Sequence, residues 1–297
     1  MIDYQLLNAL SAVISEGGFE KASKKLFITQ SAVSRRIHQL EAKLGEPVLI
    51  RTQPPTPLGK RLLNHLQQVL QLEVALNVEA LNEHTDLNTP LSVKLAANAD
   101  SLATWLPEAL AVLDTELACK LRFEVISEDQ SIAHKRMKDG EVMVCISSSP
   151  EPVNGGLVSP LGAIRYKAIA SPDFIKQHKL TELSQLAHLP CLVFSEYDKL
   201  QHQFLEDING SAPLFTHIYP SSEGFKQAMI AGLGYGLLPT LQLGDSLIKG
   251  ELVDLFPEYY IDTPLYWHYW QTESPQLKTL RKFALQVAGK RLEPISP

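Results

Sequence analysis

The segment that begins at Gln30 places several hydrogen-bonding side chains on one side of a predicted helix. Its apolar residues recur at helical spacing, at Val33, Ile37, Leu40 and Leu44. Burying that stripe turns the other face outward, and this face carries Gln30, Ser31, Ser34, Arg35 and His38. Their amide, hydroxyl and guanidinium groups can bind base edges and phosphates in a major groove. Lys25 and Arg51 lie on either side as candidates for phosphate contacts. The alternative is an ordinary solvated helix face.

Three short helices would position these side chains. Apolar stripes over residues 6–14, 19–26 and 33–44 predict them, and glycines at 17, 18 and 45 end the first and the third. Thr29 is placed to cap the third helix, because its hydroxyl can accept from an unpaired first-turn amide. A tight turn between the second and third helices gives a helix-turn-helix outline.

A strand, a proline-rich turn and a long helix follow. Residues 47–52 predict a strand and residues 53–57 a turn, which together would form a wing. Thr56 can cap a new helix with Pro57 at its first position. That helix would run to about Asp86, and its apolar seam is too long for a head of this size to bury. We therefore expect it to pair with a second copy of the chain.

Beyond Pro90, short apolar runs alternate with amphipathic stretches. The runs predict strands over 91–97, 121–126, 142–146, 167–170, 191–194, 216–219, 235–238 and 265–270. The stretches predict helices over 102–117, 131–139, 199–208, 222–231 and 275–292. This alternation indicates parallel sheets covered by helices, divided into two lobes that crossing strands join. A cleft between such lobes is the default ligand site.

Composition narrows the class of protein. The net charge is −6, yet residues 1–65 hold nine Lys and Arg against five acidic residues, which favours a polyanion partner for that end alone. We expect no membrane span, no secretory signal and hence a cytoplasmic protein. The three cysteines and nine histidines show no metal-ligand spacing, and no nucleophile motif occurs, so we expect no metal, no cofactor and no enzyme.

One stretch of the chain carries a family resemblance. FEKASKKLFITQSAVSRRIHQLEAKLG, followed by PVLIRT, resembles the winged helix-turn-helix of LysR-type transcriptional regulators. NADSLATWL, the pairs at 128–129 and 222–223, and LYWH at 265–268 resemble the arginine- and lysine-responsive branch, which includes the arginine-export regulator and chromosome-initiation inhibitor. The resemblance implies an α/β chain with an N-terminal winged helix-turn-helix, a long linker helix and a C-terminal two-lobed domain like periplasmic binding proteins. It also implies a homodimer or homotetramer on double-stranded DNA with a partly palindromic operator.

The domain boundaries that follow are expectations. They are residues 1–58 for the DNA-binding domain, 59–89 for the linker and dimerisation helix, and 90–297 for the effector-binding domain, with lobes of about 90–162 plus 268–297 and 163–267.

For the effector, the resembling branch implies lysine or arginine. Such a ligand needs carboxylates for its cationic groups and donors for its α-carboxylate. Residues near the predicted strand ends and helix starts supply both: Asp100, Ser101, Glu128, Asp129, Asp198, Ser222 and Glu223. Each has an ordinary alternative, since a carboxylate or hydroxyl at these places can also cap a helix or face solvent.

Two other functions stay open. The two-lobed part could be a solute-binding or enzymatic domain that has a helical appendage. Within the family, the chain could instead be a nucleoid or replication-origin binder with broad sequence tolerance.

Overall fold

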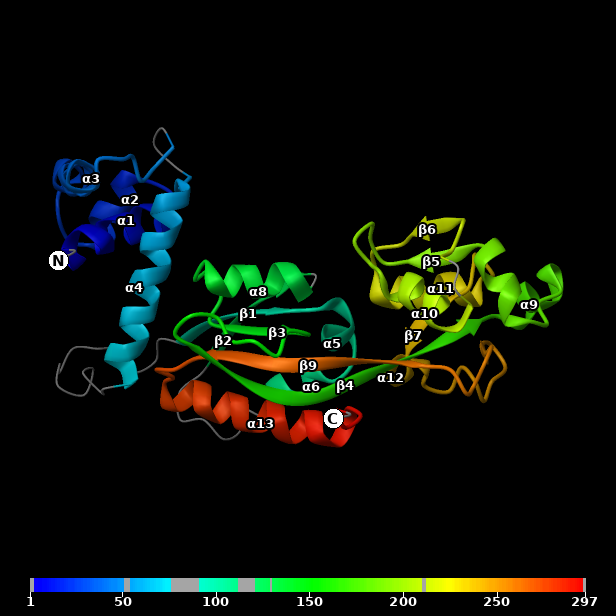
Figure 1. Ribbon diagram of the computed structural model, residues 1–297. Coiled ribbons are helices and arrows are strands. Elements are labelled where there is room, and N and C mark those ends of the chain that lie inside the picture. Colours follow the sequence, from blue (N-terminus) through cyan, green and yellow to red (C-terminus); the bar gives the residue numbers. More distant parts are fainter. Residues whose placement is uncertain are drawn as a thin grey trace.

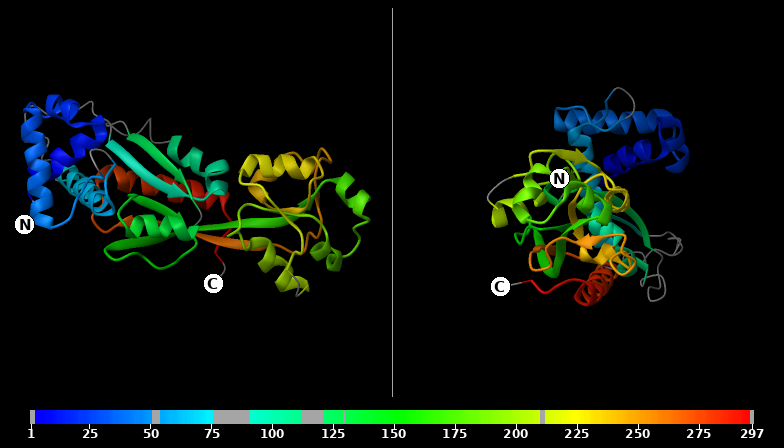
Figure 2. Two further views of the ribbon diagram at one scale, coloured as in Figure 1. Left: turned by 90° about the horizontal axis from the view of Figure 1, so that it is seen from above. Right: turned by 90° about the vertical axis from the view of Figure 1, so that its right-hand side faces the viewer.

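The computed structural model describes residues 3–50, 54–75, 91–111, 121–128, 130–209 and 212–295. A helical head stands at one end, and a long helix, α4, leads from it toward a two-lobed α/β body (Figure 1). Figure 2 shows the head and the second lobe at opposite ends of the molecule. Among the helices of the described ranges, none is both long enough and apolar enough to cross a membrane.

The head contains the three predicted helices, α1 (Tyr4–Glu16), α2 (Phe19–Lys25) and α3 (Gln30–Leu44). Gly17 and Gly45 end α1 and α3 in the left-handed conformation, with φ of 73° and 74°. The Thr29 hydroxyl caps α3 by accepting from the amide of Ala32 at 3.2 Å. The three predicted helices, their glycine stops and this cap are confirmed.

The wing is short and close to the start of α4 (Pro57–Ala75). Leu49 pairs with Pro55 across it in a single antiparallel bridge. Thr56 caps α4 as predicted, since its hydroxyl accepts from the amide of Gly59 at 3.1 Å. Gly59 lies so close to the Val48 carbonyl that no larger residue fits there without a shift. The predicted continuation of the helix to Asp86 lies outside the described residues.

The first lobe is built on most of a seven-stranded sheet with the strand order β2-β1-β3-β9-β4-β7, in which β8 also pairs with β4. Strands β1 and β3 are parallel neighbours, as are β1 and β2. Helix α8 lies on one face of the sheet, and α6 and α13 lie on the other (Figure 1). The elements of this lobe are β1 (Leu91–Ala97), α5 (Ala99–Ala103), α6 (Leu106–Ala111), β2 (Leu121–Ser127), α8 (Gln130–Lys138), β3 (Val144–Ser147) and α13 (Pro275–Arg291).

Two long antiparallel strands, β4 (Gly156–Ala170) and β9 (Ile261–Trp270), run from the first lobe into the second (Figure 1). The chain between them forms the second lobe, where the parallel strands β5 and β6 make a small separate sheet. In chain order, the elements between β4 and β9 are α9 (Pro172–His178), the 3-10 helix η2 (Leu183–His188), β5 (Cys191–Val193), α10 (Leu200–Asn209), β6 (Thr216–Ile218), α11 (Ser222–Ile230), β7 (Gly236–Pro239), α12 (Thr240–Leu243) and β8 (Val253–Asp254).

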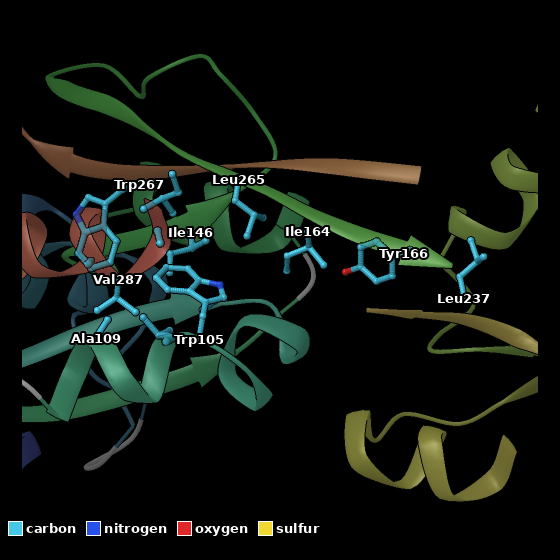
Figure 3. Close-up of a cluster of buried hydrophobic side chains, with 14 of the residues drawn as sticks. Trp105, Ala109, Ile146, Ile164, Tyr166, Leu237, Leu265, Trp267 and Val287 are labelled. Carbon is cyan, nitrogen blue, oxygen red and sulfur yellow. The ribbon is translucent and has the colours of Figure 1, made fainter. Parts of the chain in front are cut away.

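The largest apolar cluster extends along the crossing strands. It includes Trp105 and Trp267, both fully buried, and it reaches Tyr166 and Leu237 toward the second lobe (Figure 3). A separate cluster fills the head. The α/β class, the winged head and the two-lobed body are confirmed.

The sequence placed some boundaries wrongly. Strand β4 begins at Gly156 instead of residue 167, and its register with β9 shifts between Pro160 and Gly162. The predicted helix over 102–117 is divided in its described part into α5 and α6, because Thr104 leaves helical geometry with φ −121° and ψ −84°. Helix α9, which Ser171 caps, was not predicted.

Candidate functional site

Helix α3 presents the predicted polar face to solvent. Val33, Ile37 and Leu40 are buried against the head core. The opposite face carries four exposed side chains and one half-buried hydroxyl: Gln30, Ser31, Arg35, His38 and Ser34. Burial of the apolar stripe fixes the rotation of the helix, so these hydrogen-bonding groups are available to a ligand as large as a nucleic acid.

Two of the predicted DNA-contacting residues, Lys25 at the end of α2 and His38 on α3, already have internal contacts. The Lys25 ammonium lies 2.7 Å from the Glu16 carboxylate and donates to the Ser15 hydroxyl at 3.2 Å. The His38 ring lies 3.6 Å from Glu41. A phosphate contact by Lys25 therefore requires it to leave or share Glu16. The predicted wing contact, Arg51, lies outside the described residues.

Phe27, in the turn between α2 and α3, was not singled out by the sequence. Its side chain is 95% exposed, and its backbone has φ 53°. A bulky residue rarely adopts a positive φ. A sequence pattern gives no signal for this conformation, because the turn residues FIT contain no glycine.

A cavity of about 590 Å³ lies between the two lobes. The first lobe contributes residues at the carboxyl ends of the parallel strands β1, β2 and β3, where α/β sheets bind ligands. The second lobe contributes α10, α11 and the segment from β7 to α12, and the crossing strands contribute Tyr166 and Thr263. Its volume lies in the usual range for small-molecule sites.

Asp100 is at the centre of a hydrogen-bond network in this cavity. The Ser222 hydroxyl donates to Asp100 Oδ1 at 2.6 Å, and the Tyr166 hydroxyl donates to Asp100 Oδ2 at 2.7 Å. Gln242 Nε2 in turn donates to Ser222 at 2.7 Å. Burial raises the pKa of Asp100, the two hydrogen bonds oppose this rise, and the nearby charge of Asp198 adds to it. The network joins α5 of the first lobe to α11 and α12 of the second.

Two other predicted acids, Asp198 and Glu128, line the cavity and have different partners. Asp198 holds its own loop, since its oxygens accept from the amides of Phe194 at 2.9 Å and Leu200 at 3.0 Å. Glu128 forms an ion pair with Arg136, which also binds Glu141. Asp129 lies outside the described residues. Asp100 and Asp198 therefore carry charges that no cationic side chain among the described residues pairs.

Two predicted cavity residues are not among the described residues that line it. The Ser101 hydroxyl is fully buried and accepts from the Trp105 indole at 3.1 Å. Glu223 is exposed on α11 and accepts from Gln227 at 3.1 Å. The Ser101 side chain therefore has an ordinary role in the core. The Glu223 side chain has an ordinary contact within its own helix. We do not retain either as an effector contact.

Sequence reasoning found Ser222 but missed most of the other neutral polar residues of the cavity. Three amide oxygens on lining side chains are buried without a hydrogen-bond partner among the described residues, those of Asn98, Gln201 and Gln242. Tyr166 was missed too, because its strand was predicted to begin one residue later. The signal that could have found Asn98 was its place directly after the first strand.

Arg165, next to Tyr166 on β4, is not among the residues that line the cavity. Its guanidinium forms two hydrogen bonds to Asp262, at 2.8 and 2.7 Å, and lies 4.0 Å from the ring centroid of Tyr260. Successive residues of a strand point to opposite faces, which separates Arg165 from Tyr166. Its positive charge is thus neutralised away from the ligand cavity.

Comparisons with known proteins match both the head and the two-lobed body. Residues 4–60 match the bacterial regulatory helix-turn-helix proteins of the lysR family, and residues 91–289 match the LysR substrate binding domain. The chain is 46% identical to the HTH-type transcriptional regulator ArgP of Pseudomonas aeruginosa, over 100% of this chain and 99% of that protein. It is 40% identical to ArgP of Vibrio vulnificus, over 98% of each.

Solved structures give the same assignment. ArgP from Mycobacterium tuberculosis has a TM-score of 0.83 at 30% identity, covering 99% of this chain and 100% of that chain. Full-length LysG from Corynebacterium glutamicum with bound effector Arg has a TM-score of 0.73 at 31% identity, with the same coverage. The chain belongs to the LysR family of transcriptional regulators.

Proposed function

We propose that this regulator binds a basic amino acid, lysine or arginine, in the cavity between its lobes, and that its binding to DNA changes in response. The observation that carries the proposal is the negative charge of two carboxylates on the lining of the cavity. Asp100 and Asp198 both line the cavity, and neither carboxylate has a cationic partner among the described residues. A ligand that carries positive charge on N–H donors would pair with them.

The cavity also offers donors for an α-carboxylate. Lys199 is the one cationic side chain among the described lining residues, and Ser127, Ser148 and Thr263 also line the cavity with hydroxyl-bearing side chains. An amino acid with its carboxylate toward these groups and its side-chain cation toward Asp100 or Asp198 would pair every charge. The relatives named ArgP, and LysG with bound Arg, support this ligand class.

The DNA-binding part of the proposal assigns α3 to the major groove. Gln30, Ser31, Ser34, Arg35 and His38 would read bases or hold phosphates, because they form its solvent-facing side. Lys25 and the wing residue Arg51 would contact flanking phosphates. The operator would be partly palindromic, since a homodimer or homotetramer presents paired heads. The protein would act in the cytoplasm, and we assign it no catalytic step.

Calorimetry with lysine and arginine tests the effector. The unmodified protein should bind at least one of them, and Asp100→Asn should weaken binding about tenfold or more, because it removes a buried charge that faces a cation. Glu223→Gln is the matched control and should bind normally, since Glu223 does not line the cavity. Absence of binding by the unmodified protein would remove the basic amino acids from the proposal.

A gel-shift titration tests the DNA assignment. Arg35→Ala should weaken operator binding, whereas Arg291→Ala, at the far end of α13, should leave it unchanged. Equal affinity of wild type for operator and random DNA would instead favour the broad-specificity nucleoid binder.

A further inference from the structure

Phe27 is an apolar side chain on the polar surface of the head, in the turn that leads from α2 into α3. It is 95% exposed, the largest fraction among the exposed large hydrophobic residues of the described chain. Its neighbours Leu26 and Ile28 pack against the core of the head, and the Phe27 ring lies in solvent between them. The other exposed residues from 24 to 31 are all polar: Lys24, Lys25, Thr29, Gln30 and Ser31.

The fold of this turn does not require a phenylalanine. Helix α2 ends in a Schellman motif, in which the Ile28 amide donates to the Ser23 carbonyl at 3.1 Å and the Phe27 amide donates to the Lys24 carbonyl at 3.3 Å. The motif holds Phe27 in the left-handed region, with φ 53°. Glycine, and sometimes asparagine, adopts this conformation at a lower cost in free energy. Folding alone therefore favours another residue type at this position.

The ring also contributes little to the stability of the free chain. Hydrophobic stabilisation is proportional to the apolar area that is removed from water, and the Phe27 side chain has lost almost none of its accessible area. A bulky residue that is held in an unfavourable conformation, with its ring in water, indicates a contact that a partner provides.

The position of the turn indicates DNA as that partner. In a helix-turn-helix protein, the N-terminal residues of the second helix contact base edges in the major groove. Phe27 lies two residues before Thr29, which caps the N-terminus of α3. Most groups on the base edges of the major groove are hydrogen-bond donors and acceptors, but the C5 methyl group of thymine is apolar and makes contacts with apolar side chains.

We propose that Phe27 reads a thymine in each half-site of the operator, through contact between its ring and the C5 methyl group of the base. The contact removes the ring and the methyl group from water together, so a thymine is preferred there over a base that lacks the methyl group. This role rests on the proposed DNA-binding function and adds an apolar contact to the hydrogen-bonding groups of α3.

Gel-shift titration of the full chain tests this role on an operator that wild-type protein selects from a random-sequence DNA pool. The operator is synthesised with deoxyuridine, which lacks the C5 methyl group, in place of each thymine in turn. At one position or more, wild type should bind the deoxyuridine form about threefold to fivefold more weakly, the effect of one methyl group that is no longer buried. Phe27→Asn should bind the thymine operator more weakly than wild type does, and should bind the two forms equally at that position, because it lacks the ring.

Two controls accompany this variant. Ile248→Asn also removes an exposed apolar side chain, since Ile248 is 86% exposed, but it lies in the second lobe, at the opposite end of the molecule from the head (Figure 2). It should keep the wild-type preference for thymine. Asparagine suits the left-handed conformation, so the melting temperature of Phe27→Asn should not fall. If it does fall, Phe27→Gly replaces this variant in the titration.

The outcomes separate this role from the proposed function. Phe27→Asn that binds both forms more weakly by the same factor, and so keeps the wild-type preference for thymine, would overturn the contact with the methyl group. The same holds for unchanged binding by Phe27→Asn, and for wild-type protein that binds the deoxyuridine and thymine forms equally at every position. Selection that yields no preferred sequence would instead refute sequence-specific DNA binding and, with it, the role of Phe27.

Discussion

Acid should destabilise the first lobe through one buried histidine. His268 on β9 is fully buried, and its Nε2 lies 3.0 Å from both the Ser147 hydroxyl and the Ser149 carbonyl. The carbonyl only accepts, so Nε2 carries the hydrogen, and Nδ1 is then the unprotonated nitrogen. Nδ1 is buried and has no partner among the described residues. A second proton would therefore be on Nδ1, where it has no acceptor. The ring centroid of His134 lies 5.1 Å from that of His268.

Burial, with a smaller contribution from His134, lowers the pKa of His268 from 6.5 to about 4. The unfolded chain takes up a proton at the ordinary value, while the folded lobe does not. The resulting stability is complete above pH 6.5 and is lost as the pH falls toward about 4. The full difference corresponds to about 3 kcal/mol, of which about 2 kcal/mol is lost between about pH 7 and about pH 5.

Urea unfolding followed by tryptophan fluorescence measures this effect. All three tryptophans of the chain, Trp105, Trp267 and Trp270, belong to the first lobe, so the signal reports that lobe. His268→Gln keeps an amide donor for the Ser149 carbonyl but has no group that titrates in this range. Over the same pH interval, the free energy of unfolding of this variant should fall by about 2 kcal/mol less than that of wild type. If the two proteins lost stability in parallel, the reasoning about His268 would be wrong.

Three other changes have expected outcomes. Gly59→Ala should destabilise the head by about 1–3 kcal/mol in thermal melts, because the new methyl group meets the Val48 carbonyl. Gly289→Ala, in the exposed part of α13, is the control and should be neutral or stabilising by up to about 1 kcal/mol. Thr29→Ala should cost the head about 1 kcal/mol in the same assay, because α3 loses its cap, and an unchanged melting temperature would contradict the capping role. Effector affinity should fall as the pH is lowered toward 3.8, because burial raises the pKa of Asp100 above that value and the carboxylate takes up a proton. In calorimetry, Asp100→Asn should flatten that pH dependence.

Local patterns in the sequence were sufficient for the head. Helices α1 to α3 have apolar stripes bounded by glycine or a capping threonine, and those signals act within one or two turns. The first half of β4 was missed for an equally local reason. Pro160 and Gly162 interrupt the strand pattern there, and the structure accommodates them in an irregular register opposite β9.

The cavity was predictable only in part. Asp100 and Asp198 were found because a charged residue beside a strand end is conspicuous in a sequence. Gln242 was not, because its role depends on contact with Ser222, which no local pattern encodes. Ser101 does not line the cavity, because its hydroxyl lies on the buried side of the chain and accepts from Trp105. Which side of a short helix meets another lobe is decided by tertiary packing.

The second lobe is an insertion into the first, because the chain enters and leaves it through the two crossing strands. The chain enters it along β4 and returns along β9, and Tyr166 is paired with Ile261 where the two strands lie side by side. The entry and exit points are therefore adjacent, as in domains that evolution or engineering can exchange between hosts. A tight hairpin joining these two strands would close the first lobe without the second. Conversely, a foreign second lobe with a similar gap between its ends could be grafted there to give the same head a new effector.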